Sequence, residues 1–156
     1  TARELFTGEI TGKHNAKVIE GKFEGKVNSY FSDEELFNAS KEEEPYKGQK
    51  YEKKIHVETF YKDGKKNGQY MEYHANGPLH IKTYYKDDKL DGEYFYYNRA
   101  GILDFKGHYK NGQKDGECIY YRGGKIKEKG CYKEGTRIGE WLEYNREGQV
   151  TKKVKH

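Results

Sequence analysis

The sequence predicts an all-β protein, an elongated antiparallel meander of about five to six consecutive β-hairpin repeats of 23–24 residues that form a mostly single-layer, twisted sheet. Three observations predict this fold: a repeat of nearly constant length, apolar residues that alternate with period two, and glycine-containing dipeptides where the chain must reverse. Only 33% of the 156 residues are hydrophobic, but 16 are Tyr and 7 are Phe. Because aromatic rings bury large areas while keeping polar tips, they supply the apolar surface that the composition otherwise lacks.

The repeat is clearest in the C-terminal part of the chain. Segments that begin at Gly68, Gly92, Gly116 and Gly139 align at spacings of 24, 24 and 23 residues. A fainter copy begins at Gly25 and is interrupted by an insert rich in Glu and Lys. The sequence therefore predicts one array with a degenerate first repeat at 1–24, a repeat at 25–67 with its insert at about 37–53, regular repeats at 68–91, 92–115 and 116–138, and a terminal repeat at 139–156.

Each repeat predicts one hairpin, in which positions are counted from the repeat glycine as zero. The first strand carries apolar residues at positions 3 and 5, such as Met71 and Tyr73. The returning strand carries them at positions 11, 13 and 17, such as Leu79 and Tyr85. This alternation predicts that the odd positions share one buried face, while the dipeptides NG, DG and GG supply the positive φ needed for chain reversal.

The even positions predict a second face, which carries further rings and a lysine in every regular hairpin. If position 5 pairs with 11 and position 3 with 13, position 2 lies opposite position 14, so that each lysine lies beside a ring in most hairpins. Exposed aromatic and cationic side chains favour protein contacts. The candidate binding face comprises Tyr70, Tyr94, Tyr96, Tyr120, Trp141, Tyr84, Lys82, Lys106, Lys129 and Lys153. A structural role, in which lysine stems cover tyrosine rings, is the alternative.

The insert at about 37–53 is the second candidate surface, because long departures from a repeat are often functional. The overlapping segment 32–44 is the one helical candidate, with Ser32 as its N-cap. At the ends of the array, Thr1–Ile10 and Gln149–His156 are expected to form edge strands. The protein is therefore expected to be a monomer or an edge-paired dimer.

The segments YKDGKKNG, YYKDDKLDG, YKNGQKDG and YKEGTRIG, with HANGPL and NRAGIL as hairpin turns, resemble the MORN-repeat variant family, and in particular bacterial YwqK-type antitoxin-like proteins. The resemblance is strong over residues 54–156 and degenerate over 1–36, and the insert lies outside it. It implies a β-hairpin array that binds other proteins and has no catalytic activity of its own. Position 2 varies among the repeats, so the resemblance does not identify the partner.

The sequence contains no arrangement that predicts catalysis. Its glycines fit turns rather than a GxGxxG or phosphate-binding loop, and the turns DGKKNG and DDKLDG lack the alternating carboxylates of a calcium loop. His56 and His80 occupy equivalent positions in neighbouring hairpins, but two imidazoles without a further ligand make a weak metal site. Cys118 and Cys131 are expected as diagonal neighbours on one face, too far apart for a disulfide. We therefore expect a protein that is not an enzyme, without metal or cofactor.

The net charge of +4 arises from scattered charges of both signs, which argues against a nucleic-acid partner. We expect a non-enzymatic protein–protein interaction module, antitoxin-like or a secreted or surface-associated binding protein, whose partner is another protein rather than a membrane lipid. The alternative is binding of glycan or choline-type cell-wall ligands by the aromatic hairpin face. Because the chain begins at Thr1 rather than Met, a processed bacterial protein, secreted or periplasmic, is expected, with a cytoplasmic location as the alternative.

Overall fold

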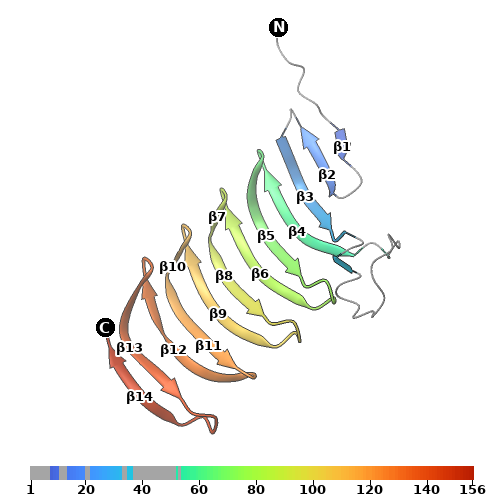
Figure 1. Ribbon diagram of the computed structural model, residues 1–156. Coiled ribbons are helices and arrows are strands. Elements are labelled where there is room, and N and C mark those ends of the chain that lie inside the picture. Colours follow the sequence, from blue (N-terminus) through green and yellow to red (C-terminus); the bar gives the residue numbers. More distant parts are fainter. Residues whose placement is uncertain (1–7, 11–13, 20–21, 33–34, 37–51, 53) are drawn as a thin grey trace.

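The protein is all-β, and its strands form a single open antiparallel sheet in the computed structural model, which describes residues 8–10, 14–19, 22–32, 35–36, 52 and 54–156 (Figure 1). The described strands are β1 (Gly8–Ile10), β2 (His14–Ile19), β3 (Lys22–Tyr30), β4 (Ile55–Lys62), β5 (Lys65–Tyr73), β6 (Leu79–Lys86), β7 (Lys89–Leu90), β8 (Gly92–Tyr97), β9 (Leu103–Lys110), β10 (Gln113–Lys114), β11 (Gly116–Arg122), β12 (Lys125–Lys133), β13 (Thr136–Tyr144) and β14 (Val150–Lys155).

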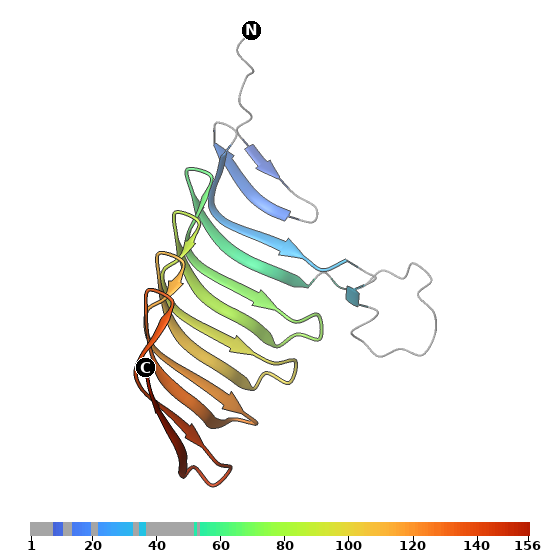
Figure 2. The same ribbon diagram turned by 60° about the vertical axis from the view of Figure 1, so that its left-hand side comes forward.

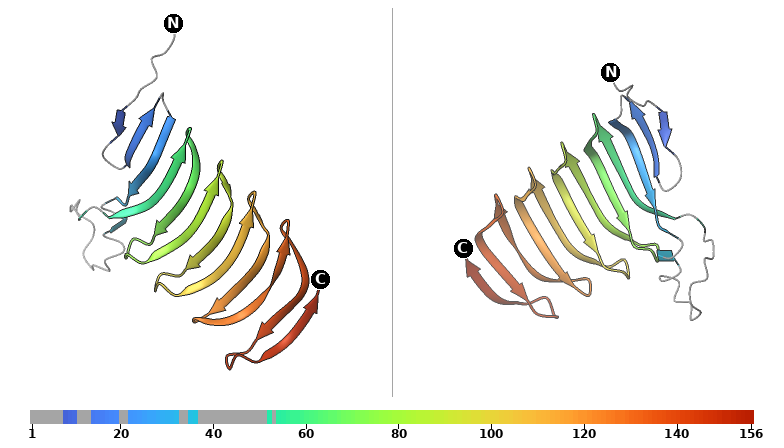
Figure 3. Two further views of the ribbon diagram at one scale, coloured as in Figure 1. Left: turned by 180° about the vertical axis from the view of Figure 1, so that it is seen from behind. Right: turned by 45° about the horizontal axis from the view of Figure 1, so that its top comes forward.

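Chain order and sheet order coincide, which makes the sheet a meander. The order is β1-β2-β3-β4-β5-β6-β8-β9-β11-β12-β13-β14, and the short strands β7 and β10 extend the hairpin ends by pairing with β6 and β9. The strands lie in one bowed layer, and the first and last strands lie at opposite ends of an elongated array (Figures 2 and 3). The predicted meander of consecutive hairpins in one layer is confirmed.

A β-bulge in each repeat hairpin from β3 to β14 changes the predicted register. Position 5 pairs with position 11, as predicted, in the pair Tyr73↔Leu79. Position 3, however, pairs with position 14 rather than 13, in the pair Met71↔Lys82, because His80 is an extra residue on the returning strand. The same shift follows Tyr96, Tyr120 and Glu143 in the later hairpins and Ser29 in the interrupted one. A bulge adds one residue to one strand, so the alternation of faces is reset there.

The bulge distributes the odd and even positions over both faces, so the predicted odd-numbered core is wrong. Residues paired directly across two strands point to the same side. One face, called the aromatic face, therefore carries positions 2, 4, 13, 15 and 17, and the other, called the lysine face, carries positions 3, 5, 11, 14 and 16. The most buried side chains, Trp141, Thr83 and Cys118, all lie on the aromatic face.

Carboxylates at one end of the hairpins link each turn to the next. Asp91 accepts a hydrogen bond from the backbone N–H of Asn111 at 3.2 Å, and Asp115 accepts one from Glu134 at 3.3 Å. Asn111 and Glu134 both have positive φ, at 52° and 48°, as the reversal requires. These acidic residues of the repeat thus bind backbone N–H groups of the following turn.

The interrupted repeat has the same register as the regular ones. β3 pairs with β4 through Val27↔Thr59 and Tyr30↔Ile55, so the insert joins the two strands of an otherwise regular hairpin. At its start, the Ser32 hydroxyl accepts the Glu35 N–H at 3.2 Å while the Glu35 carboxylate accepts the Ser32 N–H at 2.7 Å. This is a capping box, as the predicted N-cap requires. Glu35 and Leu36 are helical, and the remainder of the predicted helix and insert, apart from Glu52, lies outside the described residues.

Candidate functional site

The aromatic face is a continuous layer of rings that crosses the sheet from hairpin to hairpin. Ring centroids lie 5.2 Å apart for Tyr94 and Tyr109, 4.8 Å for Phe105 and Tyr120, and 5.1 Å for Tyr132 and Trp141. Such contacts between rings stabilise the sheet, over which no second layer of described residues packs. Trp141 is only 1% exposed, so the layer functions as the core of the described array.

Two glycines make room for this layer. A Cβ atom on Gly130 would lie 2.3 Å from ring atoms of Trp141, and one on Gly107 would lie 2.9 Å from the sulfur of Cys118. The indole therefore lies directly over the backbone of Gly130, an arrangement in which a ring covers the exposed glycine backbone. Neither glycine has a positive φ, so close packing rather than backbone conformation requires them.

Cations two residues before the repeat glycine are packed into the aromatic face. Lys114 lies 4.8 Å from the ring centroid of Phe105, and its Nζ donates a hydrogen bond to the Tyr120 hydroxyl at 2.8 Å. Arg137 lies 3.8 Å from the Trp141 ring and pairs with Glu128 at 2.7 Å. Sequence reasoning missed these residues, although the recurrence of Lys66, Lys114 and Arg137 at one repeat position was a signal that could have identified them.

Burial raises the pKa of several tyrosines of this layer. Burial, followed by neighbouring Tyr109, raises the pKa of Tyr94 to about 12. Burial also raises the pKa of Tyr70, whose hydroxyl donates to Glu72 at 2.8 Å, and the pKa of Tyr120, which hydrogen-bonds to Tyr132. Protonated phenols packed against one another in this way contribute to the stability of the fold.

The lysine face contains a row in which apolar residues and lysines alternate from strand to strand. Each member is the direct cross-strand partner of the next, in the order Met71, Lys82, Phe95, Lys106, Ile119, Lys129, Leu142 and Lys153. We call these residues the lysine row. Its apolar members are all half-buried. No other described element covers this face.

The charges of the lysine row are only partly neutralised by the protein itself. Lys106 pairs with Glu93 at 3.5 Å and lies 5.4 Å from the ring of Phe95, while Lys153 lies 3.8 Å from a carboxylate oxygen of Glu140. These carboxylates are more than half exposed, so the pairs are screened by water. A partner that excludes water from the row would meet both positive charge and apolar surface.

The ten residues predicted to form one binding face divide evenly between the two faces. The aromatic face holds Tyr70, Tyr94, Tyr96, Tyr120 and Trp141, whereas the lysine face holds Tyr84, Lys82, Lys106, Lys129 and Lys153. The prediction that these residues share a face, with each lysine opposite a position-2 ring, is wrong because it assumed unbroken alternation through the bulge. Trp141 is also too buried to contact a partner.

The structure also changes the predicted relations between the two cysteines and between His56 and His80. Cys118 and Cys131 are both free, as expected, but the pairs Cys118↔Gly130 and Glu117↔Cys131 place their side chains on opposite faces. His56 stacks on Phe31 with ring centroids 4.4 Å apart, while the rings of His80 and His74 are tilted, with centroids 4.1 Å apart. No cluster of three His, Cys, Asp or Glu able to hold a metal occurs among the described residues.

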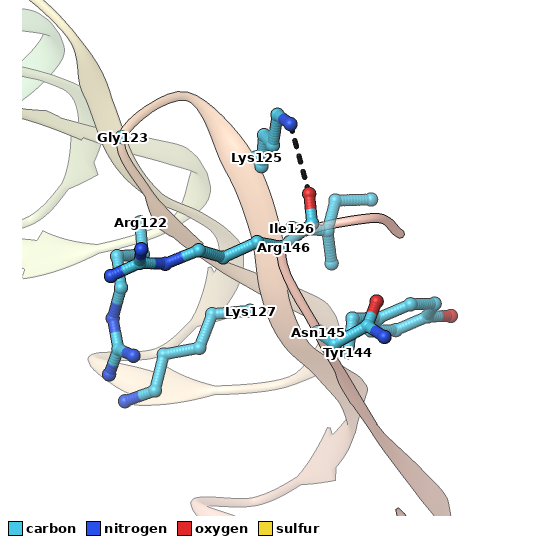
Figure 4. Close-up of a pocket in the computed structure, with 8 residues that line it drawn as sticks. All are labelled: Arg122, Gly123, Lys125, Ile126, Lys127, Tyr144, Asn145 and Arg146. Atoms are coloured by element: carbon cyan, nitrogen blue, oxygen red, sulfur yellow. Dashed lines mark hydrogen bonds between the residues drawn. The ribbon is translucent and has the colours of Figure 1, made fainter. Parts of the chain in front are cut away.

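A pocket of about 340 Å³ lies at the hairpin tips near the C-terminal end of the array. It is lined by Arg122, Gly123, Lys125, Ile126, Lys127, Tyr144, Asn145 and Arg146. The Lys125 ammonium donates a hydrogen bond to the backbone carbonyl of Arg146 at 2.9 Å, which joins the two tips (Figure 4). The charged ends of Arg122, Lys127 and Arg146 extend toward the same side of the pocket (Figure 4). Sequence reasoning did not identify this pocket.

Comparison with protein-family models gives no match to this chain, and comparison with curated proteins gives none either. No helix in the described part of the chain is long and apolar enough to span a membrane. Function is therefore inferred from the lysine row, the aromatic layer and the tip pocket.

Proposed function

We propose that the array is a non-enzymatic protein-binding module, and that its lysine face is the binding surface. The observation that carries the proposal is the lysine row, in which half-buried apolar side chains alternate with lysines on a face that no described element covers. A single sheet cannot bury both of its faces by itself. Apolar residues on the second face therefore remain available to a partner.

The row defines the chemistry of the partner. Phe95, Ile119 and Leu142 offer apolar contacts, and the lysines between them attract carboxylates. Positive and apolar groups in strict alternation fit a protein segment that presents acidic and apolar side chains in the same order. The resemblance to MORN-repeat variant proteins supports the same class of function, and an antitoxin-like role is one form that it would take.

The aromatic face is a poorer candidate for glycan or choline-type ligands. Such ligands stack on exposed rings, but here the rings pack against one another, and the single Trp lies beneath Arg137. The most exposed tyrosines among the described residues, Tyr84 at 40% and Tyr96 at 38%, lie on opposite faces of the sheet. They therefore do not form a paired aromatic site, and no observation favours this alternative.

The proposal is tested by reversing charge within the row and outside it. The variant Lys106→Glu/Lys129→Glu changes two adjacent lysines of the row. The matched control, Lys86→Glu/Lys110→Glu, changes the net charge equally at exposed lysines that end β6 and β9, outside the row. Each immobilised protein is exposed to cell extract, and the proteins that it captures are quantified.

We expect the wild type and the control to capture the same dominant acidic partner. The row variant should retain at least about tenfold less, since reversed charges inside an interface leave like charges facing each other. Equal capture by all three proteins would show that the lysine row is not the binding surface. Circular dichroism of both variants establishes that the sheet is intact.

A further inference from the structure

The pocket at the hairpin tips concentrates positive charge in a chain whose charges are otherwise mixed. Arg122 ends β11, Lys127 lies on β12, and Arg146 lies in the turn between β13 and β14. The residues lining the pocket include these three cations and Lys125, but no carboxylate. Among the described residues, no ion pair involves Arg122, Lys127 or Arg146. Like charges held together in this way favour a bound anion that neutralises them.

The other hairpins show that the repeat geometry brings these side chains together. Arg122 and Lys127 occupy positions 6 and 12 of their repeat. In the first regular hairpin the same positions hold His74 and His80, whose ring centroids lie only 4.1 Å apart. The hydrogen bond between neighbouring hairpin tips also recurs. The Asn76 side chain donates to the backbone carbonyl of Arg99 at 2.9 Å, as the Lys125 side chain does to that of Arg146.

Among the junctions between regular hairpins, only that between 116–138 and 139–156 combines three Lys or Arg residues at these positions, whereas the first holds His74, His80 and Arg99. At the preceding junction, positions 6 and 12 hold Asn98 and Asp104, and the facing tip holds Gly123. The scaffold is therefore shared by the regular repeats, whereas the cationic lining is confined to one place. A local departure of this kind points to a ligand rather than to stability of the array.

We propose that this pocket binds a phosphate monoester. Two guanidinium groups present planar forks that match the oxygens of a phosphate, and Lys127 adds a third positive charge for a dianion. A pocket of about 340 Å³ is larger than a phosphate alone and falls within the ~300–1,000 Å³ typical of sites for small organic ligands. The ring of Tyr144 and the side chain of Ile126 supply an apolar wall for the organic group.

The shared chemistry is a phosphate group on an organic carrier, and the carrier is a small soluble molecule or a lipid headgroup. Phenyl phosphate is the soluble probe, and vesicles containing phosphatidic acid are the lipid probe. The site lies outside the lysine row, so its occupancy and the proposed protein binding are separable. Failure of one leaves the other unaffected.

The test compares two double variants by calorimetric titration with phenyl phosphate. Arg122→Gln/Arg146→Gln removes both guanidinium groups from the pocket. Arg99→Gln/Lys110→Gln removes the same charge elsewhere and includes Arg99, which occupies the same repeat position as Arg146. We expect the pocket variant to bind at least about tenfold more weakly than the wild type, and the control to bind normally.

Charge on the ligand provides a second readout. The second pKa of a phosphate monoester is ~6, so the wild type should prefer phenyl phosphate over the monoanionic phenyl sulfate near pH 7.5 and lose this preference at about pH 5. Vesicle flotation that depends on Arg122 and Arg146, without binding of phenyl phosphate, would identify the phosphate as that of a lipid. The proposal would be overturned if both double variants lost affinity for phenyl phosphate equally. It would also be overturned if neither phenyl phosphate binding nor vesicle flotation depended on Arg122 and Arg146.

Discussion

At the scale of single residues, Gly130 determines how closely a ring approaches the sheet. Trp141 lies over its backbone, and any side chain at Gly130 would occupy the space of the indole. We expect Gly130→Ala to lower the free energy of unfolding by about 1–3 kcal/mol, the usual cost of overpacking a filled site. Chemical denaturation monitored by circular dichroism, a signal that does not depend on the single Trp, measures the change.

A double-mutant cycle with Trp141→Leu separates this contact from the different intrinsic strand propensities of glycine and alanine. In the Trp141→Leu background, Gly130→Ala should cost much less, because the smaller side chain leaves space for the methyl group. An equal cost in both backgrounds would mean that contact with the indole is not the reason for the glycine.

At the scale of the hairpin, the sequence predicted the strands and turns but not the faces. Alternating apolar residues and glycine dipeptides are local signals, so the strands and their order followed from them. The bulge residues, in contrast, are His80, Asp104, Lys127 and Thr151, four unlike residue types without a common turn signal. An extra residue that leaves no compositional trace still inverts the alternation. The predicted binding residues were consequently assigned to one face although they occupy two.

The packed cations and the tip pocket were missed for a related reason. Lys114 and Arg137 lie near the turns, where a basic residue is usually solvated, and nothing local indicates that they lie over rings. The pocket combines residues from two successive hairpins, so it becomes visible only when their tips are placed side by side. Sequence reasoning that treats each repeat separately does not capture either feature.

The hydrogen bonds that link successive turns make the stability of the hairpin array depend on pH. Hydrogen bonds from Lys133 and from the Glu134 N–H lower the pKa of Asp115 below its ordinary value of 3.8. A carboxyl group with a lowered folded-state pKa stabilises the folded state above its unfolded pKa, and this contribution is lost as the pH falls through the folded pKa. We therefore expect Asp115→Asn to lower Tm near neutral pH and to differ progressively less from the wild type as the pH falls below about 4.

Thermal unfolding followed by circular dichroism across this acidic range checks the prediction. Asp87→Asn is a suitable control because Asp87 is an exposed turn carboxylate whose side chain makes no hydrogen bond or ion pair within the described part of the chain. Its difference from the wild type should not follow the pattern expected for Asp115→Asn. A difference for Asp115→Asn that stays constant down to the acid limit would exclude the proposed link between neighbouring turns.

At the scale of the whole molecule, the lysine row has a fixed spacing that a partner must match. Neighbouring strands lie ~4.8 Å apart, so lysines on alternate strands recur every ~9.6 Å along the array. Residues on one side of an extended strand recur every ~6.7 Å and do not match this interval. Residues seven apart in an α-helix recur every ~10.5 Å, a difference that flexible lysine side chains accommodate over four repeats. The proposed partner segment is therefore expected to be a helix that crosses the strands.

Two synthetic peptides of about 28 residues and identical composition test this expectation. In one, glutamate recurs every seventh residue, with leucine about half a heptad away, so that helix formation aligns both with the row. In the other, the same residues alternate as in a strand. We expect the helical peptide to bind at least about tenfold more tightly and to lose this advantage with Lys106→Glu/Lys129→Glu but not with Lys86→Glu/Lys110→Glu. Equal affinity for both peptides would show that the row attracts acidic segments without selecting a helix, since charge alone does not depend on spacing.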